Sequence, residues 1–246
     1  MMGMTRVSNL KARAALLVVG LLGTLLVLTL SACGGAGGKE EANGRPLPEV
    51  EKALDPGEYR TEEFKPSFSF RVGQGWSMET DPVEGPDELE ITWKKGTVNL
   101  FFLTIKEVYK PTESGSSTEA QAPKDMVGWL QHHPYLKTSK PKTVTVGGVK
   151  GVQVRVLVEN DLPKDYFPYC FKGVMGGPPD CVDIVPLSDG VPLTFVQGIK
   201  ENVIVLEDMK GETMTIDFGA GEPGTKFDQV AIEGQKVMDS IKWTGS

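Results

Sequence analysis

Valines at every second position of one segment constrain the fold of this chain more than any other feature. Every second position of residues 152–158 is a valine, and this run follows Gly147 and Gly148. A period of two is typical of a half-buried β-strand, and paired glycines between two such runs favour a hairpin. The segment before the glycines, KTVTV, completes the pattern. We therefore expect antiparallel strands linked by hairpins.

Strand-like runs recur through the rest of the chain. They occupy residues 58–64, 68–72, 89–95, 97–105, 192–197, 202–208 and 212–218. In the run 97–105, Phe101 and Phe102 are adjacent, so their side chains point to opposite faces of the sheet. A strand that is apolar on both faces is covered on both sides. We expect this strand to lie centrally in its sheet.

Two segments carry a helical period. Residues 123–133 start with Pro123, a residue favoured in the first turn, and the final segment 227–241 repeats apolar residues at steps of three and four. Many strands with few helices indicate an α+β fold, a mainly antiparallel β-sheet flanked by helices.

The N-terminus has the layout of a secretory signal peptide. Three basic residues precede an uncharged apolar run from Ala14 to Leu30, and Leu-Ser-Ala-Cys ends at Cys33. This ending resembles the lipobox of bacterial lipoproteins, which implies cleavage before Cys33 and lipid attachment to its thiol. The alternative is an uncleaved membrane anchor. Both interpretations place the rest of the chain outside the cytoplasm, because the positive charges precede the apolar run.

Three regions follow from this layout. Residues 1–32 form the lipoprotein signal peptide, and residues 33–57, rich in glycine, proline and charge, form a flexible tether. Residues 58–246 form a single α+β domain. Cleavage removes three basic and no acidic side chains, which takes the formal net charge from −7 to −10. Such a surface disfavours nucleic acid and anionic headgroups, so membrane contact is left to the acyl chains on Cys33.

Cys170 and Cys181 are the remaining cysteines. An even pair outside the cytoplasm predicts a disulfide, which would close a short loop. The competing interpretation, a metal pair, lacks further thiolates nearby.

The stretch GAGEPG, residues 219–224, matches the glycine pattern of a dinucleotide-binding turn. A phosphate turn needs free backbone N–H groups, yet Pro223 removes one and Glu222 places a negative charge there. Only 22 residues follow Gly224, too few for a second parallel strand. We interpret the stretch as a turn before the last helix and expect no cofactor.

Histidines and carboxylates are the candidates for catalysis. His132 and His133 diverge by about 100° on a helix, so they cannot easily share a metal. We expect one to face solvent and the other to pack beside Trp129. Carboxylates flank Cys181 and cluster in an acidic loop: Asp180, Asp183, Glu79, Asp81, Glu84, Asp87, Glu88 and Glu90. Solvated charge is the default interpretation, so no catalytic residue and no metal site is predicted.

Aromatic residues offer a different kind of site. Trp76, Trp93 and Trp129 are possible ligand-lining residues for a small apolar or peptide ligand. The alternative is core packing, since aromatic side chains bury a large apolar area.

The whole pattern resembles a family. YRTEEFKPSFSFRVGQGW, WLQHHPYLKTSKPKTVTVGGVKGVQVRV and a terminal VMDSIKW resemble secreted or lipid-anchored proteins of actinobacterial type with a PsbP-like domain. The resemblance implies an α/β/α sandwich, in which helices cover both faces of a sheet. It also implies a non-enzymatic binding or accessory role. The insertion around Cys170 and Cys181 departs from the pattern.

Together these features predict a lipid-anchored, extracytoplasmic and non-enzymatic binding or accessory protein that binds a partner protein or small ligand. Two alternatives remain: a surface hydrolase that uses acidic-loop carboxylates and a histidine, and a carrier of an apolar ligand.

The lipid attachment is testable with one substitution. Cys33→Ala removes the only thiol at the cleavage site, so we expect metabolic labelling by radioactive palmitate to be lost. Labelling is measured after immunoprecipitation, with Cys170→Ala as the matched control that keeps its label. Equal labelling of both variants would contradict the assignment.

Overall fold

The computed structural model describes residues 44–48, 52–78, 84–94, 97–111, 117–159, 162–163, 166, 180–188, 190–209, 211–220 and 227–244. The chain divides into two units, residues 1–38 and 39–246, and every described residue belongs to the second. The predicted signal peptide, Cys33 and Cys170 therefore lie outside the described residues. Neither described helix is long and apolar enough to cross a bilayer.

The largest sheet has nine strands, and every pairing in it is antiparallel. Its order is β10-β12-β15-β16-β7-β6-β5-β2, with β11 also paired to β12. The strands are β2 (Lys52–Ala53), β5 (Trp76–Met78), β6 (Glu88–Trp93), β7 (Val98–Ile105), β10 (Leu136–Thr138), β11 (Lys142–Val146), β12 (Val149–Val158), β15 (Glu201–Met209) and β16 (Glu212–Ala220).

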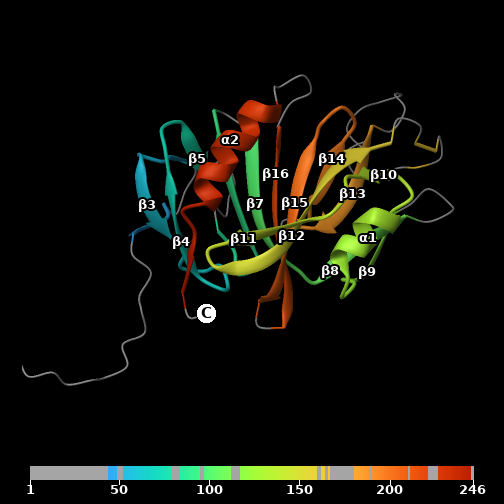
Figure 1. The fold of residues 1–246 in the computed structure, drawn as a ribbon, viewed down its shortest axis with the longest axis horizontal. Helices are drawn as coiled ribbons and strands as arrows, with labels where there is room; N and C mark the ends of the chain where they lie inside the picture. The colour runs from blue at the N-terminus through green and yellow to red at the C-terminus, as the bar shows by residue number, and fades with distance from the viewer. Residues whose placement is uncertain are drawn as a thin grey trace, which may run out of the picture. The chain divides into compact units, whose positions relative to one another are not determined.

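Smaller sheets and two helices complete the described part (Figure 1). A four-stranded sheet contains β1 (Arg45–Pro46), β3 (Gly57–Arg60), β4 (Phe68–Val72) and β17 (Lys242–Trp243). Two hairpins pair β8 (Glu107–Pro111) with β9 (Ser117–Gln121) and β13 (Cys181–Pro186) with β14 (Pro192–Val196). Helix α1 (Met126–His132) packs on β10 and β12, and helix α2 (Phe227–Met238) packs on β4, β7 and β16.

Two hydrophobic clusters lie on opposite faces of the central strands. Phe102 is fully buried in the cluster that includes β4 and α2, whereas Phe101 packs against the cluster that includes α1 and the β13–β14 hairpin. Strand β7 lies between β16 and β6. The expectation from this adjacent phenylalanine pair, a central strand covered on both sides, is confirmed.

The expected helix-flanked α/β/α sandwich is wrong. Strands make up 56% of the described residues and helices 11%, so the fold is mostly antiparallel β. The physical reason lies in what covers the sheet. Much of the apolar surface on each face is buried by other strands, the four-stranded sheet on one side and the β13–β14 hairpin on the other. The two helices, of 7 and 12 residues, cover only part of it.

Ordered structure also starts earlier than the predicted boundary at Glu58. Strands β1 and β2 pair with β3 and β5. Leu47 and Leu54 are buried in the core at 8% and 4% exposure. These two leucines anchor a segment whose composition otherwise resembles a linker.

The start of helix α1 differs from the prediction in a similar way. The helix begins at Met126, not Pro123, because Asp125 caps it by accepting a hydrogen bond of 2.7 Å from the backbone N–H of Gly128. The expected positions of the two histidines are confirmed. His132 is exposed, and His133 is buried with its ring 5.1 Å from that of Trp129.

Glu84, in the predicted acidic loop, is a structural anchor. Its Oε1 accepts backbone hydrogen bonds from Glu62, Glu63 and Phe64 at 2.9, 3.0 and 2.9 Å. The residue is only 9% exposed, and burial raises the pKa of its carboxyl while these donors oppose the rise. One carboxylate thereby fixes the chain between β3 and β4.

Replacing this anchor is expected to destabilise the domain. Glu84→Ala leaves three N–H groups without their acceptor, so the free energy of unfolding in urea should fall by about 2–3 kcal/mol. Glu84→Gln keeps an oxygen and should lose less. Glu107→Ala, at an exposed position, is the control. A Glu84→Ala protein as stable as this control would contradict the anchoring role.

Candidate functional site

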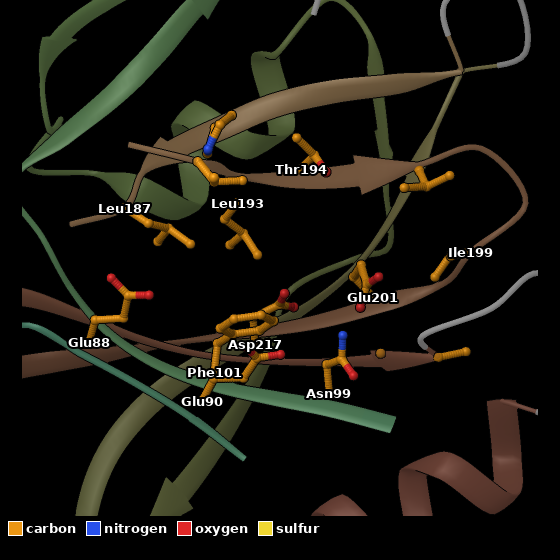
Figure 2. A pocket seen from close by; sticks show the side chains of 15 residues that line it. Glu88, Glu90, Asn99, Phe101, Leu187, Leu193, Thr194, Ile199, Glu201 and Asp217 are labelled. Carbon is orange, nitrogen blue, oxygen red and sulfur yellow. The ribbon is translucent and has the colours of Figure 1, made fainter. Parts of the chain in front are cut away.

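A cavity of about 310 Å³ lies between the large sheet and the β13–β14 hairpin (Figure 2). Strands β6, β7, β15 and β16 form its floor, and the hairpin with the loops next to it forms its roof. The lining side chains are acidic or apolar apart from one amide and one hydroxyl, and none of the described ones is basic. They are Glu88, Glu90, Asn99, Phe101, Leu187, Val191, Pro192, Leu193, Thr194, Val196, Ile199, Glu201, Asp217, Gly219 and Ala220.

Strand register determines which polar groups meet on the floor. Gly219 on β16 lies opposite both Glu201 on β15 and Asn99 on β7. Two residues earlier on β16, Asp217 lies opposite Phe101. Because side chains alternate along a strand, these residues share one face. Figure 2 shows Phe101, Glu201 and Asp217 facing the same space.

Gly219 makes room for the carboxylate of Glu201. A Cβ atom at position 219 would lie 1.4 Å from Oε2 of Glu201, well inside any allowed contact. This residue is the first glycine of the GAGEPG stretch, and it lies in strand β16. Residues 221–224 are outside the described residues. In this strand the glycine leaves room for a neighbouring side chain and is not part of a phosphate-binding turn.

Asp217 is the most unusual group in the cavity. It is 3% exposed, and its Oδ1 has no hydrogen-bond partner among the described residues. Burial raises its pKa to about 8, against the opposing effect of the Phe218 N–H. Burial, and then repulsion from Asp217, raise the pKa of Glu201 well above its usual value. At neutral pH this pair holds at least one proton and has an unused acceptor.

Glu88 has a mechanical role at one end of the cavity. Its Oε2 accepts hydrogen bonds of 3.1 Å from both the backbone N–H and the hydroxyl of Ser188. Ser188 follows β13, so this contact fastens the roof to the floor.

The predicted tryptophans lie elsewhere. Trp76 is 2% exposed in the core, and Trp93, its partner across β5 and β6, packs against the same cluster. Trp129 packs in the cluster on the opposite face. None of the three lines the acidic cavity, because large aromatic rings fill the space between sheet and covering elements.

The histidines also lie outside the cavity lining. Burial lowers the pKa of His133 to about 4, and its Nδ1 accepts a hydrogen bond of 3.3 Å from the Tyr135 N–H. A neutral imidazole among aromatic rings has a packing role. Neither histidine is therefore brought to the carboxylates of the acidic cavity.

The acidic cluster separates into different roles. Glu79 and Asp81 lie outside the described residues, and Asp87 pairs with Lys106. Glu88 and Glu90 reach the cavity. Among the described residues, no group of three or more His, Cys, Asp or Glu side chains is placed to hold a metal ion.

Cys181 and its acidic neighbours lie at the start of the roof. Cys181 is fully buried and disulfide-bonded. Cys170 is outside the described residues, so its pairing with Cys181 stays a prediction. Asp183 is buried, with its N–H donating to the Tyr166 hydroxyl at 3.2 Å, while Asp180 is exposed.

Sequence reasoning missed Glu201 and Asp217, the two central residues of the site. The available signal was an aspartate inside ETMTIDF, opposite in phase to Met214, Ile216 and Phe218. In a strand with one solvent-exposed face, an aspartate at that position is expected and indicates no site. It becomes informative only once both faces of β16 are known to be covered.

Comparisons with known proteins include distant likenesses to solved structures. No protein-family profile matches the chain, and no curated protein matches it. The solution structure of cyanobacterial PsbP (CyanoP) from Synechocystis sp. PCC 6803 is similar at a TM-score of 0.34 and 10% identity, over 87% of this chain and 98% of that one.

The apo structure of the immunity protein TplEi of T6SS from Pseudomonas aeruginosa is similar at a TM-score of 0.31 and 13% identity. The match covers 73% of this chain and spans about half, 46%, of the immunity protein. At these TM-scores neither likeness supports an inference about ligand or activity.

The raised pKa of Asp217 gives stability a defined dependence on pH. The folded chain holds a proton that the unfolded chain releases at about pH 4, so the unfolded state binds fewer protons above that value. Stability from this group is therefore full below about pH 4 and falls until the pH passes about 8.

Asp217→Asn abolishes this loss, because an amide stays neutral. We expect its free energy of unfolding to match wild type near pH 4 and to exceed it by on the order of 2–5 kcal/mol at pH 9. Urea titrations at several pH values measure the difference. Glu212→Gln, at an exposed site on the same strand, is the control, and parallel curves for both variants and wild type would show the burial argument to be wrong.

Proposed function

We propose that this chain is a lipid-anchored binding protein on the outer face of a membrane, and that its acidic cavity captures a small organic cation. The anchor is the lipid attachment expected at Cys33. The cavity is the site of recognition, and its own chemistry is binding without turnover.

One observation carries the choice of ligand. Asp217 presents a buried carboxylate oxygen without a hydrogen-bond partner among the described residues, in a cavity whose described ionisable groups are all acidic. Burying such an acceptor without a hydrogen bond is unfavourable in free energy. An ammonium donor would satisfy it with a charge-assisted hydrogen bond. The other titratable groups that face this space are Glu88, Glu90 and Glu201.

The apolar walls fit an organic cation better than a bare metal ion. Phe101 lies beside Asp217 on the floor, and an aromatic ring attracts an ammonium group at its face. Leu193, Val196 and Ile199 provide contacts for a carbon skeleton. The absence of a cluster of three or more ligating side chains within the described residues agrees with this preference.

The alternatives have less support. A hydrolase that uses a histidine would need one near these carboxylates, and neither histidine lines the cavity. A carrier of an apolar ligand would need a hollow beside the tryptophans, whereas Trp76 lies in a filled core. The acidic cavity therefore supports cation binding over both.

Binding should be linked to proton release. A cation stabilises the ionised pair, so affinity is expected to rise by up to about tenfold per pH unit between pH 6 and 8, as the proton on Asp217 is displaced. Calorimetric titration of the full chain with 1,4-diaminobutane, in two buffers of different ionisation enthalpy, measures both affinity and proton release.

Butane-1,4-diol is the neutral control ligand, and it should not bind. Asp217→Asn should lose most of the affinity, and Glu212→Gln should keep it. Equal binding of the diol, an unaffected Asp217→Asn variant, or saturation by Ca²⁺ alone would each contradict an organic-cation site.

A further inference from the structure

A second cavity, of about 310 Å³, has the opposite chemistry to the acidic one. It is lined by side chains that all carry N–H or O–H donors, and none of the described ones is acidic. They are Ser139, Lys140, Lys142, Gln153, Arg155 and Asn202.

The register of three strands assembles this cavity. Lys142 on β11 lies opposite Gln153 on β12, and Arg155 on β12 lies opposite Asn202 on β15. Gln153 and Arg155 alternate with Val154, which is buried in the cluster beside α1. The cavity therefore opens on the other face of the sheet, the face that carries α2.

Arg155 is held in place on this face. Its guanidinium carbon lies 4.8 Å from the centroid of the Phe227 ring, at the start of α2. Its backbone N–H donates to Ser139 Oγ at 2.9 Å, and its carbonyl accepts the Ser139 N–H at 2.9 Å. This double link places Lys140, the next residue, beside the arginine.

No described carboxylate compensates the charge of three cations that line this cavity. None of Lys140, Lys142 and Arg155 forms an ion pair with a described carboxylate, although Lys106, Lys137 and Lys242 each do. The chain as a whole carries a formal charge of −7. Three cations around one cavity repel each other, and an anion bound between them reduces that repulsion.

Asn202 adds a donor from the floor of the cavity. The residue is only 4% exposed, so its amide is largely shielded from water. Its neighbour Glu201 reaches the acidic cavity on the opposite face. Strand β15 thus presents an acid to one face and an amide among cations to the other.

We propose that this cavity is a binding site for a phosphate-type oxyanion, with Arg155, Lys142 and Lys140 supplying charge and Asn202 a neutral donor. Arginine matches a tetrahedral oxyanion with two parallel hydrogen bonds, and lysine acts as a point charge. The same chemistry occurs in free phosphate and in a phospholipid headgroup. This site is independent of the cation site and does not rest on it.

Calorimetric titration of the full chain with inorganic phosphate, at an ionic strength of about 0.1 M, tests the proposal. We expect saturable binding that Arg155→Gln weakens by about tenfold or more, because a charge-assisted bidentate contact is lost. Lys142→Gln should weaken it less. Lys150→Gln, an exposed lysine of the same hairpin outside the cavity, should leave it unchanged.

Dihexanoyl phosphatidate, below its micelle concentration, distinguishes the two sources. Tighter binding than inorganic phosphate supports a headgroup as the source, and equal or weaker binding supports the free anion. Circular dichroism confirms that each variant is folded. Absence of binding by both ligands, or equal losses in Lys150→Gln and the two cavity variants, would overturn the site and leave only general attraction by a basic surface.

Discussion

Burial of the large sheet on both faces is the constraint on which the rest of the structure depends. Strands β7 and β16 lie in the middle of nine, with apolar clusters on either side. A polar side chain placed there is removed from water, where an isolated charge is costly. Asp217 therefore keeps a proton to about pH 8 and retains an oxygen without a partner among the described residues. The same burial that stabilises the domain raises the pKa of the carboxyl in its cavity.

Local pattern in the sequence predicted local structure well. The valines of residues 152–158 and Gly147-Gly148 indicated the β11–β12 hairpin, and both glycines have the positive φ that such a turn requires. Phe101 and Phe102 correctly placed β7 inside a sheet. The helical period of the last segment matches α2.

What covers a sheet was not predictable from the same signals. Alternation shows that a face is buried but not whether a helix or another strand buries it, so the helix-flanked sandwich was wrong. The site depends on contacts between residues far apart in the chain. Asp217 and Phe101 meet only through the register of β16 with β7, and Glu201 reaches its position only because residue 219 has no side chain. No short sequence motif indicates either of these contacts.

Glu201 and Asn202 show how closely the two candidate sites are tied together. They are neighbours on β15 and supply one side chain to each cavity. A slip of this strand by a single position would turn an amide toward the carboxylates and a carboxylate toward the lysines. Such a slip would thus harm both cavities in one event, and the pairing of β15 with β12 and β16 is what prevents it.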